Sequence, residues 1–144
     1  IMKDCANNVR QIYVNALNGN ISYQNRNVPV YGQQPFVTTP ERYVIIGNII
    51  EVANNTNNNF SNNVEVTIDI FSEQNKNNDV SQVDNIAGQI LNILIPDTAI
   101  NGFSDSDFEI FPMSRTSSTY LPLWDGDNYV ARKVITINNL VNQK

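Results

Sequence analysis

The stretch that decides the fold runs over eight residues and reads Val64-Glu65-Val66-Thr67-Ile68-Asp69-Ile70-Phe71. Apolar and polar residues alternate along it, a period of two that is typical of a β-strand with one buried and one exposed face. A second strand is predicted over 42–53, which is rich in β-branched and aromatic residues and contains Gly47, a candidate bulge. An Asn-rich connection joins the two, so they predict an antiparallel hairpin.

Two segments around this hairpin carry the period of an amphipathic helix. Residues 2–18 place apolar side chains three and four apart, and Asn18-Gly19 then supplies a stop signal. Residues 79–95 have the stronger stripe, with Asp79 and Gln82 placed as a capping box and Pro96 ending the segment. Its apolar face consists of Val80, Val83, Ile86, Ala87, Ile90, Leu91 and Leu94. We expect Ile86, Ile90 and Leu94 to be buried against Ile68 and Ile70.

The other segments complete a fold of strands and helices. We expect a short edge strand over 28–31, a strand over 108–113, a polar loop over 115–120, a turn at Asp125-Gly126-Asp127 and a long strand over 129–141. A chain of 144 residues suits one domain, here 1–144. The predicted class is α+β, with an antiparallel β-sheet and two amphipathic helices packed on one face.

Composition excludes several classes of function. The sequence has no histidine, which removes Ser-His-Asp and Cys-His catalysis and most zinc sites, and its one cysteine, Cys5, lies on an apolar stripe and is predicted to be a buried thiol. The net charge is −5 and the arginines are scattered, so tight binding of nucleic acid is not expected. We therefore predict no enzyme activity, no cofactor and no metal.

The chain shows no feature of a membrane or secreted protein. No apolar stretch approaches the ~20 residues of a membrane helix, and the first residues lack the apolar core of a signal peptide, so we expect an intracellular origin. About one residue in six is Asn. The bias of an AT-rich genome explains this composition, and a prion-like tract is the alternative.

Two acidic clusters are candidate sites. Asp105, Asp107 and Glu109 lack the ligand spacing and the glycine of a calcium loop, which favours a solvated strand entry. Asp125-Gly126 is a hairpin-turn signal.

The aromatic residues expected in loops are better candidates. Phe36, Phe60, Tyr120 and Trp124 all fall in segments predicted to be loops. Each ring either folds back onto the core of its own chain or anchors a contact with another chain. We take the four residues as candidate contacts with partner chains.

The order of these motifs resembles the tail-terminator and tail-completion proteins of tailed bacteriophages. The resemblance rests on the N-terminal helix, on an amphipathic second helix and on four segments: Val28-Pro29-Val30-Tyr31, Tyr43-Val44-Ile45-Ile46-Gly47, Val66 to Ser72, and the closing segment Asp125 to Ile137. The order covers most of the chain, whereas the Asn-rich loops and residues 115–124 depart from it.

The resemblance implies a structural virion protein of the neck or tail, without enzymatic activity. It implies a homo-oligomeric ring, six- or twelve-fold, that contacts neighbouring portal, neck or tail proteins and is assembled in the bacterial host cytoplasm. DNA would pass through the ring without specific binding, and no membrane would be involved. A non-viral protein-binding adaptor with an exposed sheet edge is the alternative, and an enzyme limited to carboxylate chemistry comes third.

Overall fold

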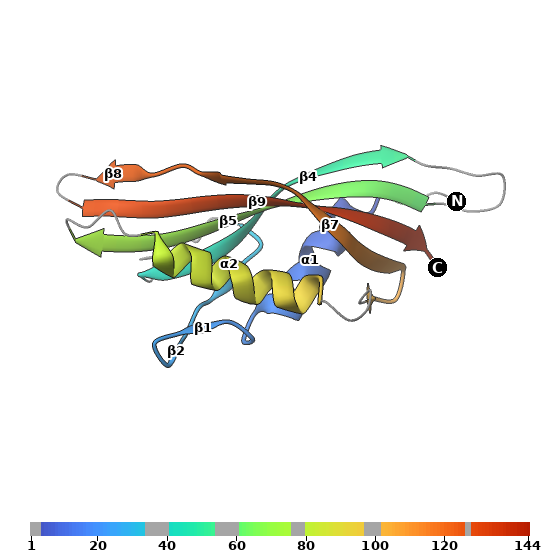
Figure 1. Cartoon of the computed structure of the whole chain (residues 1–144). Coiled ribbons are helices and arrows are strands. Elements are labelled where there is room, and N and C mark those ends of the chain that lie inside the picture. Colours follow the sequence, from blue (N-terminus) through green and yellow to red (C-terminus); the bar gives the residue numbers. More distant parts are fainter. Residues whose placement is uncertain (1–3, 34–40, 54–60, 76–79, 97–101, 126–127) are drawn as a thin grey trace.

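The computed structural model describes residues 4–33, 41–53, 61–75, 80–96, 102–125 and 128–144 (Figure 1). The helices are α1 (Ala6–Leu17) and α2 (Ser81–Leu94). The strands are β1 (Ser22–Tyr23), β2 (Arg26–Asn27), β3 (Val30–Tyr31), β4 (Arg42–Ala53), β5 (Ser61–Asn75), β6 (Phe103–Ser104), β7 (Phe108–Tyr120), β8 (Leu123–Asp125) and β9 (Asn128–Gln143). The predicted α+β content is confirmed.

One large sheet organises the molecule. Its strands follow the order β3-β4-β5-β9-β7-β6, and β8 also pairs with β9, while β1 and β2 form a separate small hairpin. The prediction of a wholly antiparallel sheet is wrong, because β3 pairs with β4 in parallel. Pro29 has no N–H to donate, but its carbonyl accepts a hydrogen bond from the amide of Val44. Side-chain alternation predicts a strand without its direction, so the sequence pattern could not reveal this parallel pair.

The alternating segment forms the centre of the sheet, as predicted. β5 pairs with β9 along its whole length, from Ser61 opposite Asn142 to Asn75 opposite Asn128. Ile68 and Ile70 are fully buried on one face, whereas Thr67 lies half-buried on the other. The predicted hairpin with β4 is also present, and the register shifts between Ile46 and Ile49, a bulge around Gly47.

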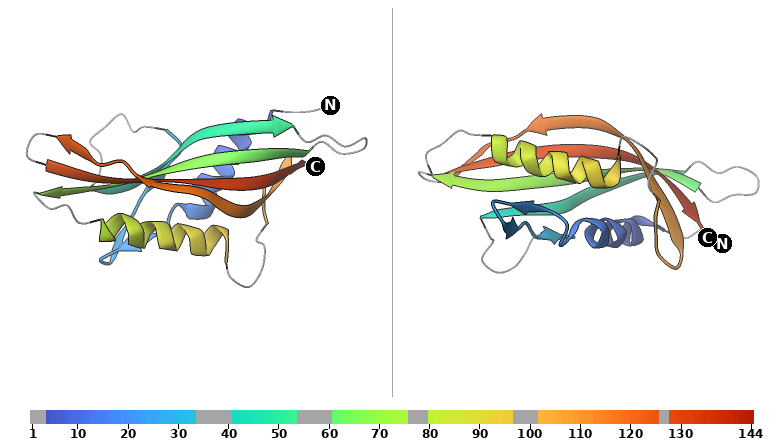
Figure 2. Two further views of the ribbon diagram at one scale, coloured as in Figure 1. Left: turned by 45° about the horizontal axis from the view of Figure 1, so that its top comes forward. Right: turned by 60° about the horizontal axis from the view of Figure 1, so that its bottom comes forward.

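Both helices contact the sheet and each other. Figures 1 and 2 show them on the same side of a twisted sheet, α1 beside β4 and α2 along β5 and β9. The buried face of α2 is formed by Val83, Ile86, Ala87, Ile90 and Leu94. These residues share one core cluster with Ile68 and Ile70, which confirms the predicted burial. The two helices have 12 and 14 residues, and neither combines the length and apolar character needed to cross a membrane.

The helices end where the sequence predicts, at Asn18-Gly19 and before Pro96, but the start of α2 differs from the predicted capping box. α2 begins at Ser81, and no side chain caps its first turn. The Gln82 side chain instead accepts hydrogen bonds from Arg42 and Ser72, so it ties the start of α2 to β4 and β5. Asp79, the predicted capping residue, lies outside the described residues.

The predicted polar loop over 115–120 is wrong, because these residues belong to β7. They pair with β9, and each of them is exposed. Serine and threonine fit an exposed strand well when a neighbouring strand holds the backbone. Pairing with β9 therefore makes this polar segment a strand. Its sequence has no apolar alternation from which a strand could be predicted.

A buried hydrogen bond links α1 to β9. The hydroxyl of Tyr13 donates to Oδ1 of Asn139, whose Nδ2 donates to the carbonyls of Val64 and Ile137 at 3.1 and 3.0 Å. Tyr13 and Asn139 are both fully buried. Burial raises the pKa of the Tyr13 phenol, which therefore remains a protonated donor. Every polar atom of the Asn139 side chain thus has a partner, which makes this polar contact compatible with an apolar core.

Replacing Tyr13 with phenylalanine should lower the free energy of unfolding by about 1–3 kcal/mol, because it leaves Oδ1 of Asn139 buried without a donor. Denaturant melts measure the change. Tyr23→Phe is the matched control, since Tyr23 is only partly buried, and it should change stability by less than about 0.5 kcal/mol. Equal stability losses in the two variants would contradict a structural role for this hydrogen bond.

Candidate functional site at an exposed sheet edge

Four large apolar side chains are exposed close together where β7 passes into β8. Tyr120, Leu121, Leu123 and Trp124 have 46%, 44%, 47% and 61% of their surface exposed. We call these four residues the apolar segment. Single exposed apolar residues are ordinary on protein surfaces, whereas a contiguous group of large ones marks an interaction site.

The backbone of β9 holds the apolar segment in an extended conformation. Tyr120 pairs with Lys133, and Trp124 pairs with Tyr129. Between them, the amide of Leu121 donates to the carbonyl of Arg132 at 2.8 Å. β7 and β8 therefore lie along the same edge of β9 as one interrupted strand, with Pro122 at the interruption (Figure 1). No other described strand pairs with the outer side of this segment.

Side-chain contacts fix both ends of the apolar segment. The Tyr120 hydroxyl donates to Oδ1 of Asp84 on α2 at 2.6 Å, and Nζ of Lys133 donates to the same oxygen at 2.7 Å. Desolvation opposes ionisation of Asp84, but the hydrogen bonds from Lys133 and Tyr120 outweigh it and lower the pKa of this carboxyl. At the other end, the Trp124 ring lies 5.1 Å from the ring of Tyr129. Both rings are thus held in place, although 46% of Tyr120 and 61% of Trp124 remain exposed.

The structure brings together two of the four aromatic residues predicted from the sequence. Tyr120 and Trp124 lie in the apolar segment, but on strands, so the expectation that they occupy loops is wrong. Phe36 and Phe60 lie outside the described residues. The sequence reasoning missed Leu121 and Leu123, although the run Tyr120-Leu121-Pro122-Leu123-Trp124 is apolar without alternation and follows a purely polar stretch.

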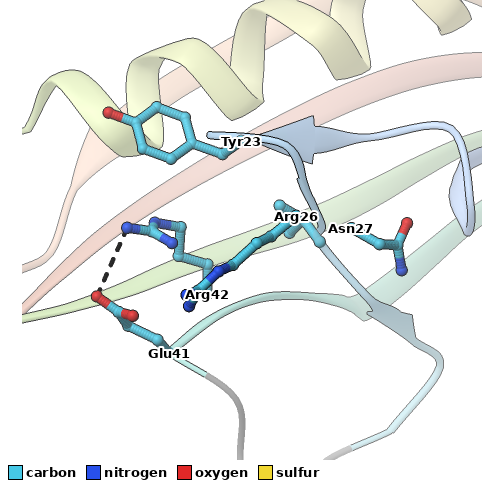
Figure 3. A pocket seen from close by; sticks show the side chains of 6 residues that line it. Tyr23, Arg26, Asn27, Glu41 and Arg42 are labelled. Carbon is cyan, nitrogen blue, oxygen red and sulfur yellow. Dashed lines mark ion pairs between the residues drawn. The ribbon is translucent and has the colours of Figure 1, made fainter.

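Two small cavities lie elsewhere on the described surface. The first has a volume of about 110 Å³ and is lined by Tyr23, Arg26, Asn27, Val28, Glu41 and Arg42 (Figure 3). Its Arg42 guanidinium lies 4.7 Å from the centre of the Tyr23 ring and forms a 3.5 Å ion pair with Glu41. The second, about 260 Å³, lies between α1 and β6. Small-molecule sites usually occupy ~300–1,000 Å³, so neither cavity suits a substrate of ordinary size.

The acidic cluster at 105–109 is explained by local structure. Oδ1 of Asp105 accepts hydrogen bonds from the amides of Asp107 and Phe108 at 2.8 and 2.7 Å, and its Oδ2 accepts one from Asn8 at 2.8 Å. Desolvation acts against these bonds, but together they lower the pKa of Asp105. Within the described ranges, no three His, Cys, Asp or Glu side chains are grouped to hold a metal ion. Asp105 therefore stabilises the turn into β7.

Cys5 has the environment of an inert thiol. It is fully buried at the start of α1, and its Sγ donates to Oε1 of Glu51 at 3.0 Å. Burial, followed by the hydrogen bond to Glu51, raises the pKa of Cys5 to about 12. The thiolate is the reactive form of cysteine, so this side chain remains protonated and unreactive near neutral pH. The predicted buried thiol is confirmed.

Comparison with known proteins assigns no relative to this chain. No protein-family model matches the sequence, and no curated protein gives a significant match. The function must therefore be argued from the sequence and from the geometry of the exposed edge.

Proposed function

We propose that this chain is a structural protein whose copies assemble through the exposed edge formed by β7 and β8. The observation that supports this best is the apolar segment, whose four large side chains stay exposed on a backbone that β9 holds rigid. Aromatic residues are enriched in protein interfaces, where desolvated rings contribute most of the binding free energy. A rigid segment also loses little conformational entropy when it binds.

The particular assembly that we propose is a ring in the neck or tail of a tailed bacteriophage, located in the virion and assembled in the host cytoplasm. The resemblance in motif order supports this proposal, as does an architecture in which two helices lie on one side of the sheet and most of both edges is unpaired among the described residues. Such a ring, six- or twelve-fold, would give the growing particle a defined end and present a matching surface to portal, neck or tail proteins. Its role would be geometric rather than catalytic.

The proposed ring should not hold DNA. With a net charge of −5 and few arginines and lysines, the isolated chain should not shift duplex DNA in a gel at physiological salt. A weak negative field in the channel would let phosphates pass without being bound. Binding at micromolar protein concentration would contradict this prediction.

Sedimentation of the wild-type chain over a range of concentrations tests the proposed self-assembly. One chain has a mass of 16.2 kDa, and an assembling subunit should sediment at several times that mass, with the larger species growing as concentration rises. An adaptor that uses the same edge for a different partner would remain at 16.2 kDa. A single monomeric species at every concentration would therefore contradict self-assembly.

A further inference from the structure

We infer that neighbouring copies join head to tail, with the open edge of β7 in one copy pairing with the open edge of β4 in the next. The sheet of one subunit would then continue into the sheet of its neighbour. This inference rests on the proposed self-assembly and adds to it the two surfaces that meet and their relative direction.

Both edges of the sheet are largely open among the described residues. On one side, β3 covers β4 only at Val44 and Ile45. On the other side, β6 covers β7 only at Glu109 and Ile110. The guanidinium of Arg10 on α1 donates a hydrogen bond to the carbonyl of Gly47 at 3.2 Å. Among the described residues, no strand pairs with the outer side of 48–53 of β4. Unpaired backbone N–H and C=O groups on such edges are a ready template for another strand.

The open stretches lie at the same level of the sheet. Following the paired residues across β5 and β9, the row that starts at Ile49 ends at Arg115 of β7. The row that starts at Glu51 ends at Pro112. Two copies placed side by side without a shift therefore bring open β7 against open β4. β3 pairs with residues 44–45 of β4 before these rows, and β6 pairs with residues 109–110 of β7 at the level beyond them, so neither blocks this contact.

Strand direction permits this contact. β4, β5, β9 and β7 each run antiparallel to the next, so β4 and β7 have opposite directions. When the second copy has the same orientation as the first, its β4 runs antiparallel to the β7 that it meets. The antiparallel arrangement of neighbouring strands within one subunit is thus preserved across the contact. A contact between two different surfaces generates a closed ring when the rotation between copies closes.

Charges on the two edges are complementary. Arg115 is directly opposite the buried Ile137, and Glu51 is directly opposite the buried Val64, so both side chains project on the helix side of the sheet. Arg115 forms no ion pair with any residue in the described part of the chain. The carboxyl group of Glu51 forms a side-chain hydrogen bond with that of Asp4. The open part of β7 therefore carries a positive side chain and the open part of β4 an acidic one, an arrangement that favours head-to-tail contact over pairing of two β7 edges.

Apolar groups are complementary as well. Ile50 on the β4 edge is 55% exposed, and Met113 on the β7 edge is 44% exposed. The apolar segment lies further along the same edge, and the row from its first residue, Tyr120, ends at Val30 of β3 on the opposite edge. There Tyr31 of β3 lies 6.4 Å from the ring of Tyr43. In a head-to-tail contact, the Tyr120 end of the apolar segment of one copy would meet this aromatic edge of the next.

Cysteine crosslinking tests the contact. Asn48→Cys places a thiol on the exposed β4 edge, Ser117→Cys places one on the exposed β7 edge, and the native Cys5 is buried. With a short bis-maleimide, the chain carrying both substitutions should give a ladder of dimers, trimers and larger products. Each single variant should give only the monomer band. Dimers from Ser117→Cys alone would show pairing of two β7 edges and overturn the inference.

Sedimentation of the same samples separates the inference from the proposed function. Oligomers without a crosslinked ladder would overturn the head-to-tail contact and leave self-assembly standing. Monomers in sedimentation together with no ladder would contradict both.

A charge exchange gives a second test. Arg115→Glu should raise the dissociation constant of the assembly at least about tenfold. Adding Glu51→Arg should restore the wild-type value, because the two side chains would again carry charges of opposite sign. Arg26→Glu makes the same change in net charge on β2, which is neither of the two strands that would pair, and should have a smaller effect. No rescue by the second substitution would contradict the proposed pairing of these edges.

Discussion

Replacing Ile90 with alanine should lower the free energy of unfolding by about 2–5 kcal/mol. Ile90 is fully buried in the middle of the apolar face of α2, in the same cluster as Ile68 and Ile70 of the central strand. Removing its side chain leaves a cavity that a close-packed core cannot refill, so the lost transfer free energy and the cavity both contribute. Denaturant melts of the wild type and the variant measure the difference.

Asn92→Ala is the matched control for this substitution. Asn92 is on the same helix but exposed, so its replacement should change stability by no more than about 0.5 kcal/mol. A loss of less than about 1 kcal/mol for Ile90→Ala would mean that α2 does not form part of the core. If both variants lost the same amount, the effect would belong to the helix rather than to its buried face.

Replacing Trp124 with alanine should raise the dissociation constant of the assembly by about thirtyfold or more, which corresponds to the ≥2 kcal/mol of a desolvated aromatic anchor. In the single chain, 61% of this residue is exposed and its ring contacts Tyr129 on one side. Truncation therefore costs the monomer little and the interface much. Sedimentation measures the assembly, and a thermal melt at a concentration that favours monomers measures the fold.

Trp124→Phe keeps an aromatic ring at this position and serves as the matched control. It should retain most of the assembly, because the apolar contact survives. If Trp124→Ala instead lowered the melting temperature by as much as a core substitution, and the oligomer were lost only through unfolding, then the ring would stabilise its own sheet and not an interface.

The parts of the fold that could be predicted from sequence are those whose pattern reflects burial. Residues 64–71 alternate because one face of β5 is covered, and 79–95 carry a stripe because α2 lies on that face. Local patterns of this kind survive in the folded chain. The direction of β3 and the extension of β7 through 115–120 depend instead on contacts between segments far apart in the sequence. The hydrophobic pattern of a single segment carries no information about such contacts.

The candidate site was predictable only in part, for a related reason. Tyr120 and Trp124 are candidates from the sequence because they are aromatic residues in segments predicted to be loops. Leu121 and Leu123 become candidates only because β9 places this run on the exposed edge. Equally, Glu51 and Arg115 have no relation in the sequence. They become complementary only because the sheet places them on one face at its two opposite edges.

Electron microscopy of the purified wild-type chain tests the central claim most directly. If the chain is a ring-forming subunit, images should show closed rings with one fixed number of copies, and the Trp124→Ala variant should show few or none at the same concentration. A field of particles no larger than a single 16.2 kDa chain, or open filaments of unlimited length, would contradict the account.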